Sequence, residues 1–189
     1  MKTRRLLLPL IALFAGVLSA QTPVSIPIFN PIFQDDTLSC SPSGGCAYFS
    51  ITGWVVGPET YVQKMSPTQY PTAPVDGLYV AAIGNSSATG SILQTLGVTV
   101  QANTTYILTI GVGARADYPF TGYLASLMAG NVTVAASHSA TPVGGTFVSD
   151  VIEYKSGATP AQLGQPLQIF VKSVGTGQVD VAKVTLTMQ

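Results

Sequence analysis

The sequence is poor in charged residues, cysteine and histidine, and each shortage disfavours a class of protein. Only 8% of its 189 residues are charged, whereas an average globular protein has about a quarter. The single histidine, His138, excludes most zinc sites, which need several nitrogen or sulfur ligands. The chain also has no phosphate-binding loop and no glycine motif for dinucleotides. These absences, with many glycines, prolines and threonines, favour a β-rich extracellular protein over a cytosolic enzyme.

Apolar residues are abundant, but they form a long run only at the N-terminus. Three basic residues within the first five precede the apolar stretch 6–18, and small residues end it at Ala20. This order is typical of a secretory signal peptide, which we predict at 1–20, with one domain at 21–189. No later apolar run approaches the roughly 18 residues of a spanning helix, so we expect no transmembrane segment. We expect a secreted, extracellular protein, with the periplasm or the cell surface as alternatives.

Removal of the signal peptide would leave the chain acidic. Three of the eight basic residues lie in 1–20, so five remain against eight acidic residues, a net charge of about −3 (5 − 8). Proteins that bind nucleic acids usually present a basic surface. We therefore expect no nucleic-acid partner.

The only two cysteines, Cys40 and Cys46, lie close together. In an oxidising compartment two neighbouring cysteines usually pair. The proline and glycines between them make the short loop easy to close, and a redox motif would have only two intervening residues. We therefore predict a structural disulfide.

Apolar side chains alternate with other residues along many short stretches, and this pattern predicts strands. It is clearest from Tyr106 to Val112, and Gly130-Asn131 between two apolar runs predicts a hairpin. No stretch combines a helical period with caps, so we predict an all-β, antiparallel β-sandwich. The predicted strand regions are 24–33 (an edge strand or extended arm), 47–56, 61–65, 78–83, 92–100, 106–112, 123–128, 132–134, 146–154, 167–174 and 179–188.

The order of several motifs resembles a known family. It is that of secreted bacterial proteins with a galactose-binding-like jelly roll, many of which carry a C-terminal sorting signal of the Pro-Glu-Pro type that is absent here. The chain is also distantly similar to carbohydrate-binding modules and plant cell-wall proteins of that fold. The resemblance implies a jelly-roll domain. It rests on Thr52-Gly53-Trp54, Asp76-Gly77 before an apolar strand, Leu93-Gln94-Thr95-Leu96, the strand from Asn103 to Gly113, the segment GARADYPFTGYLASLMAG and the closing VAKVTLT.

The resemblance also implies a structural calcium ion near the chain ends. The matching ligand positions are Gln34 and Ala182, which are neutral, although Asp180 has the same strand parity as Ala182 and could replace it. Calcium needs about six to eight oxygen ligands. We therefore predict no cofactor and no metal-binding residues, with a structural calcium as the alternative.

Catalytic groups are hard to find in the sequence. His138 lies in a polar stretch typical of a solvated loop. Asp35 and Asp36 would point to opposite faces of a strand, and so would Asp150 and Glu153, which we expect to be solvated. With neither a carboxylate pair nor a nucleophile beside a base, we predict that the protein is not an enzyme.

Sugar binding needs only an aromatic face and a few polar groups. We predict a secreted, non-catalytic binding module whose partner is a polysaccharide, a cell-envelope glycan or another cell-surface polymer. The alternative is a structural surface or extracellular-matrix protein without a small ligand. For single residues, the alternatives to ligand binding are that Trp54 fills the core and that Arg115 pairs with Asp117. The aromatic supply comprises Trp54, Tyr61, Tyr70, Tyr79, Tyr118 and Tyr123, and the candidate ligand-binding residues are Trp54, Tyr61, Tyr79, Arg115, Asp117 and Tyr118.

The disulfide leads to the first testable prediction. Thiol titration of the secreted, denatured protein should detect no free thiol, and two thiols would refute the pairing of Cys40 with Cys46. Because the closed loop is short, replacing either cysteine with serine should lower the free energy of unfolding by no more than about 2 to 3 kcal/mol. The variant should still fold.

Overall fold

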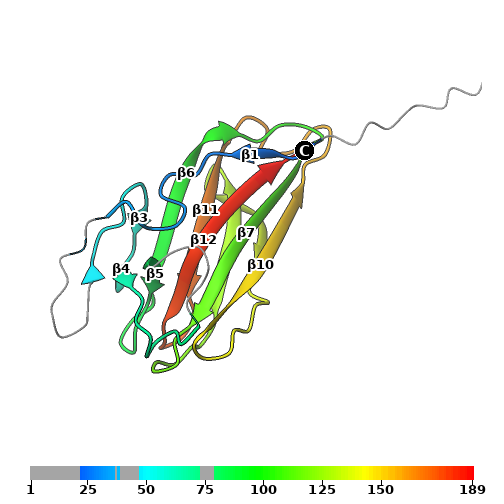
Figure 1. The fold of residues 1–189 in the computed structure, drawn as a ribbon. Coiled ribbons are helices and arrows are strands. Elements are labelled where there is room, and N and C mark those ends of the chain that lie inside the picture. Colours follow the sequence, from blue (N-terminus) through cyan, green and yellow to red (C-terminus); the bar gives the residue numbers. More distant parts are fainter. Residues whose placement is uncertain (1–21, 37, 39–46, 73–78) are drawn as a thin grey trace, which may run out of the picture.

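The computed structural model describes residues 22–36, 38, 47–72 and 79–189. In this part of the chain all regular elements are β-strands, and they form two antiparallel sheets packed face to face (Figure 1). None of the described residues forms a helix that could cross a membrane. The predicted all-β, antiparallel sandwich is confirmed.

The larger sheet contains β1 (Val24–Ile26), β2 (Ala47–Tyr48), β4 (Thr60–Lys64), β5 (Tyr79–Ile83), β7 (Thr105–Ala114), β10 (Thr146–Lys155) and β12 (Val179–Met188). Its order is β10-β7-β12-β5-β4-β2, and β1 pairs with the last residues of β12. The smaller sheet contains β3 (Val55–Val56), β6 (Ser91–Thr99), β8 (Tyr123–Ala129), β9 (Val132–Ser137) and β11 (Pro166–Ser173), in the order β3-β6-β11-β8-β9.

Each predicted strand region contains a strand, but two regions are shorter than expected. Only residues 24–26 of the first region pair, because Pro27 and Pro31 have no backbone N–H to donate. The region 47–56 is divided into β2 and β3 by a turn, in which the Trp54 N–H donates to the Ile51 carbonyl at 2.9 Å. The predicted hairpin forms, with φ of 55° at Gly130 and 68° at Asn131, as a type I′ turn requires.

Strand β7 lies between β10 and β12 and sets the two faces of the larger sheet (Figure 1). Its inward residues are completely buried against the smaller sheet: Tyr106, Leu108, Ile110 and Val112. The residues between them therefore point to the outer face. On β12 the register shifts between Val181 and Val184, which pair with Val112 and Ile110, so a bulge places Ala182 and Lys183 opposite Gly111.

A buried carboxylate ties the N-terminal segment to the turn before β3. Both oxygens of Asp36 accept hydrogen bonds from the Thr52 N–H at 3.1 and 3.2 Å, and the Thr52 hydroxyl donates to Oδ1 at 2.6 Å. Asn30 Nδ2 also donates to Asp36, at 3.3 Å. Asp35, next to it, is exposed. These adjacent acids occupy a bend rather than a strand, and only one of them is structural.

This asymmetry predicts different effects of the same substitution at neighbouring positions. Asp36→Ala should lower the free energy of unfolding by about 1.5 to 3 kcal/mol, because it leaves the donors of Thr52 and Asn30 without a charged acceptor. Asp35→Ala should change it by less than about 0.5 kcal/mol. Urea unfolding of both variants measures the difference, and equal effects would contradict the role of Asp36.

Candidate functional site

One row of side chains crosses the outer face of the larger sheet, over five neighbouring strands. The strand register pairs each member of the row with the next, and directly paired residues point to the same face. An acid occupies the centre of the row, a residue with little or no side chain lies on each side of it, and an aromatic residue follows at each end. In order from β10 to β4, these residues are Phe147, Gly113, Asp180, Ala82 and Tyr61.

Asp180 is a carboxyl group removed from water, with only 1% of the residue exposed. The Tyr70 hydroxyl donates to its Oδ2, and Gln178 Nε2 donates to its Oδ1 at 2.6 Å. Burial raises the pKa of Asp180 to about 6, although the hydrogen bonds from Tyr70 and Gln178 and the charge of Arg115 lower it. The group is therefore able to carry and release a proton near neutral pH.

Tyr70 covers Asp180 from the loop between β4 and β5. The backbone next to Tyr70 is fixed by a hydrogen bond from the Ala116 N–H to the Gln69 carbonyl at 3.0 Å, and by one from the Tyr70 N–H to the Ser66 carbonyl at 2.9 Å. The Tyr70 residue is 2% exposed. Burial and the adjacent Asp180 raise the pKa of Tyr70, so its hydroxyl stays protonated and remains a donor to the carboxyl.

The Phe147 ring packs against the Tyr70 ring. The two rings stack with their centroids 4.5 Å apart and an interplanar angle of 28°. The Phe147 ring also lies against Gly113, where an added Cβ would come within 2.3 Å of Cε1. Only glycine at position 113 leaves room for this ring.

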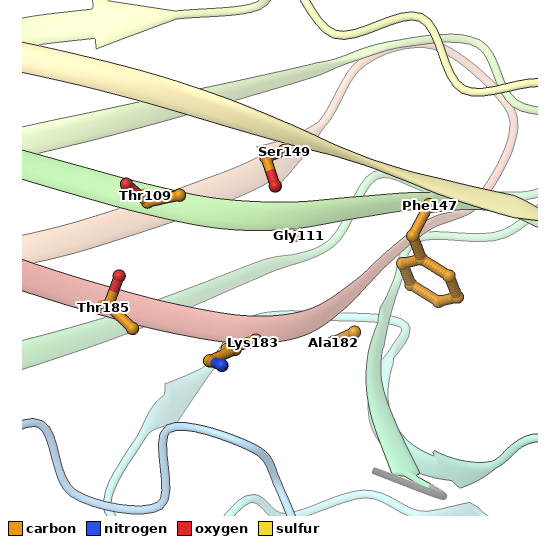
Figure 2. A pocket seen from close by; sticks show the side chains of 7 residues that line it. All are labelled: Thr109, Gly111, Phe147, Ser149, Ala182, Lys183 and Thr185. Atoms are coloured by element: carbon orange, nitrogen blue, oxygen red, sulfur yellow. The ribbon is translucent and has the colours of Figure 1, made fainter. Parts of the chain in front are cut away.

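An open groove of about 370 Å³ begins at Phe147 and follows the outer face of β7, β10 and β12 (Figure 2). Hydroxyl-bearing side chains line much of it, and its floor is open because Gly111 has no side chain. An added Cβ on Gly111 would have ordinary contacts, the nearest at 3.6 Å. The residues lining the groove are Thr109, Gly111, Phe147, Ser149, Ala182, Lys183 and Thr185.

Gln178 connects Asp180 to a second group of polar and aromatic residues. Its Oε1 accepts hydrogen bonds from the Tyr61 hydroxyl at 3.0 Å and from Arg115 Nη1 at 3.3 Å. Arg115 also donates twice to Asp117, both at 2.9 Å, and lies 5.2 Å from the centre of the Tyr118 ring. The hydrogen bond from Arg115 lowers the pKa of Asp117. This pair is therefore ionised and fixes the rim of the site.

The structure brings together four of the six predicted ligand-binding residues: Tyr61, Arg115, Asp117 and Tyr118. Trp54 lies elsewhere, buried against Phe33 with ring centroids 5.6 Å apart, and its Nε1 donates to the Asn30 carbonyl at 3.3 Å. Tyr79 is partly buried and packs against the core. From the sequence, Asp180 is recognisable only as a possible calcium ligand. Nothing in the sequence points to Gln178 or Phe147 as site residues, because the strand register that brings them to Asp180 is not visible there.

A second buried acid corrects another expectation. Asp150 was predicted to be solvated, but it is 3% exposed. The Tyr123 hydroxyl donates to it, and so do Ser137 Oγ at 2.9 Å and Ser139 Oγ at 3.1 Å. These partners lie on β8, on β9 and just after β9, and they cover Asp150. Glu153, in contrast, forms an exposed ion pair with Lys155. Asp150 is fully engaged in joining the edges of the two sheets.

The described residues do not fit the implied calcium site. Gln34 is exposed, the Ala182 side chain has no ligand atom, and both carboxyl oxygens of Asp180 accept hydrogen bonds from Tyr70 and Gln178. Within the described ranges no group of three or more acids, histidines or cysteines is placed to hold a metal ion. Cys40 and Cys46 lie outside the described residues, so their disulfide stays a prediction.

Comparison with known proteins identifies a family of enzymes. A family model described as HpiC1-like, HpiC1 cyclase, matches residues 24–187 of the chain. None of the curated proteins is significantly similar in sequence.

Solved structures confirm the jelly-roll fold. The Stig cyclase FisC from Fischerella sp. TAU, in complex with (3Z)-3-(1-methyl-2-pyrrolidinylidene)-3H-indole, is 23% identical with a TM-score of 0.78, over 89% of this chain and 98% of that one. A cyclase from Fischerella sp. TAU in complex with 4-(1H-indol-3-yl)butan-2-one is 24% identical with a TM-score of 0.76, over 88% and 98%. TmCBM61, in complex with β-1,4-galactotriose, is 13% identical with a TM-score of 0.53, over 85% and 97%.

The family match overturns the functional predictions. The prediction of a non-catalytic binding module for glycans, with its structural alternative, is wrong, and so is the prediction that the chain is not an enzyme. A glycan or cell-surface polymer as partner is also wrong, because the matching family is one of cyclases. The resemblance to carbohydrate-binding modules holds for the fold. The physical reason for the error is that a lone buried carboxyl can supply a proton without a partner acid, base or metal.

The buried carboxyl predicts how stability depends on pH. Folding raises the pKa of Asp180 from 3.8 to about 6, so its contribution to the free energy of unfolding is complete below about pH 4 and is lost as the pH rises through about 6. Between about pH 4 and about pH 7, wild-type protein should lose roughly 3 kcal/mol relative to Asp180→Asn. Urea unfolding across this range provides the measurement, and parallel curves for the two proteins would contradict the assignment.

Proposed function

Since this chain belongs to the HpiC1-like cyclase family, we propose that it closes a ring in a small organic substrate and that Asp180 donates the proton that starts the reaction. The observation that carries this proposal is a single carboxyl, 1% exposed, whose pKa is raised to about 6. An acid is most effective when its pKa lies near the working pH. Tyr70 and Gln178 then stabilise the carboxylate that remains, because both donate hydrogen bonds to it.

The proposed step needs no oxidant, reductant or second substrate. Asp180 transfers its proton to one carbon of a double bond, and the neighbouring carbon becomes a cation. A second double bond of the same molecule donates its electron pair to that cation, which forms the new ring bond and moves the positive charge along the chain. The Asp180 carboxylate then takes a proton from a carbon next to the charge, and a double bond forms there. The product is an isomer of the substrate, and the acid is restored.

The aromatic rings around Asp180 suit a reaction through cations. Phe147 and Tyr61 lie at the two ends of the row that has Asp180 at its centre, and the face of an aromatic ring attracts positive charge. Phe49, with 69% of its residue exposed, contacts Tyr61 edge-on at 5.7 Å between ring centroids. These rings also favour an aromatic, largely apolar substrate, and the indole compounds held by the solved cyclases support that class.

Substitution of Asp180 tests the proposal by its effect on the rate. Asp180→Asn should lower kcat by at least about 10²-fold, because it removes the transferable proton. The assay uses indoles that carry an unsaturated side chain, with product isomers separated by mass-resolved chromatography. Asp150→Asn is the matched control, since that acid is equally buried beside a tyrosine but lies away from the site. Loss of activity in the control alone, or full activity in Asp180→Asn, would contradict the role of Asp180.

The pH dependence of the reaction gives a second test. Because the acid acts in its protonated form, kcat/KM should fall as the pH rises through about 6. The hydrogen bond from Tyr70 lowers the pKa of Asp180, so Tyr70→Phe should move this fall to higher pH. Tyr123→Phe, which removes the hydroxyl beside Asp150, should leave the profile in place. If the profile of Tyr70→Phe moved to lower pH, this would contradict the role of Tyr70 as a hydrogen-bond donor to Asp180.

We also propose that the enzyme acts outside the cytoplasm, as a secreted protein or in the periplasm or at the cell surface. The support is the signal-peptide pattern of residues 1–20, together with two cysteines suited to an oxidising compartment. N-terminal sequencing of the exported protein should give a start at Gln21. Recovery of the uncleaved chain from the cytosol alone would contradict this location.

A further inference from the structure

We propose that Phe147 is a positioning residue that separates Asp180 from the open groove beside it and keeps groove water from the acid. This inference rests on the proposed function of Asp180 as a proton donor. The role proposed for Phe147 differs from packing in the hydrophobic core, because the residue is only partly buried and lines the groove itself.

The strand register places the Phe147 ring beside the acid. Phe147 and Asp180 both pair with Gly113, from opposite sides of β7. Since Gly113 has no side chain, the ring can lie across β7, and Figure 2 shows it extending from β10 towards β12. Three ring atoms would lie within 2.7 Å of a Cβ at position 113. The ring therefore fills the space that a side chain on Gly113 would occupy next to Asp180.

The two sides of Phe147 face different surroundings. On one side is the open groove of about 370 Å³, whose lining includes the hydroxyl groups of Thr109, Ser149 and Thr185, which are partners for water entering from the solvent. On the other side the ring stacks on Tyr70, whose hydroxyl donates to Asp180. An apolar ring between a hydrated groove and a buried acid keeps the acid desolvated.

The other neighbours of Asp180 act by hydrogen bonding or charge. From β4, Tyr61 contributes a hydroxyl that is bonded to Gln178. The loop before β5 contributes Tyr70, and the segment after β7 contributes Arg115, paired with Asp117. Removing Phe147 leaves all these groups in place and changes mainly the access of water. Because burial is the largest cause of the raised pKa of Asp180, added water should lower that pKa.

A carboxyl titration followed by ¹³C NMR tests the inference without any substrate, with the Asp180 signal assigned from its absence in Asp180→Asn. Phe147→Ala should lower the measured pKa of Asp180 by about one pH unit or more. Phe147→Leu, which keeps an apolar cover, should stay closer to wild type than to the alanine variant. A merely structural role would lower the melting temperature in Phe147→Ala and leave the titration unchanged, and that result would overturn the proposal.

Two glycines on the same face of β7 provide a matched pair. Gly113→Ala should lower the pKa of Asp180 as Phe147→Ala does, because its Cβ would displace the ring. Gly111→Ala has no contact closer than 3.6 Å and should leave the titration unchanged. In the Phe147→Ala background, Gly113→Ala should cause no further fall, since no ring is left to displace. Fully additive effects, or an unchanged pKa in Gly113→Ala, would contradict the inference.

Activity measurements separate this inference from the proposed function. If Asp180 is the proton donor, Phe147→Ala should move the fall of kcat/KM to lower pH by the same amount as the NMR titration moves. If Asp180→Asn retains full activity, the proposed function fails, but the titration results still decide the role of Phe147. If Asp180→Asn is inactive and the titration of Phe147→Ala matches wild type, the inference about Phe147 fails alone.

Discussion

The hydrogen bond between Tyr70 and Asp180 is the interaction on which the site depends, because it closes an acid away from water on what would otherwise be the solvent face of a sheet. A buried carboxyl is costly unless it is hydrogen-bonded or protonated. Here both oxygens accept hydrogen bonds, and the pKa is still raised to about 6. This balance keeps the proton available without making the acid permanently neutral.

The architecture of the larger sheet serves this balance. Small residues at positions 82 and 113 leave space on both sides of Asp180, and aromatic rings from β4 and β10 complete the row. Strand β5 is buried on both faces from Val80 to Ile83. This is unusual, because each sheet of an antiparallel sandwich commonly has one face in water. The site is thus built on strands, and its cover is Tyr70, whose neighbouring backbone is held by hydrogen bonds to Ser66 and Ala116.

Local patterns were sufficient to predict the strands, because alternation and turn residues act over a few positions. The segment from Tyr106 to Val112 and the Gly130-Asn131 turn are examples. Asp180 illustrates the limit: Phe147 lies 33 positions away (180 − 147) and Tyr61 lies 119 positions away (180 − 61), and strand register and Gln178 join them to it. Asp150 shows the same limit: it pairs with the inward residue Ile110, and its hydrogen-bond partners Tyr123 and Ser137 lie on β8 and β9 of the other sheet. Function was mispredicted because the search was for pairs of catalytic groups, whereas proton-initiated ring closure needs one acid in an apolar setting.

The central claim is that the carboxyl of Asp180 holds its proton near neutral pH and gives it to the substrate. The most direct test records the carboxylic-acid C=O infrared band, as the difference between wild type and Asp180→Asn, on the same samples used for cyclisation rates. We predict that the band and the rate disappear together, with a common midpoint near pH 6. A band that is lost near pH 4, as for an exposed aspartate, while the rate persists to higher pH, would contradict the account.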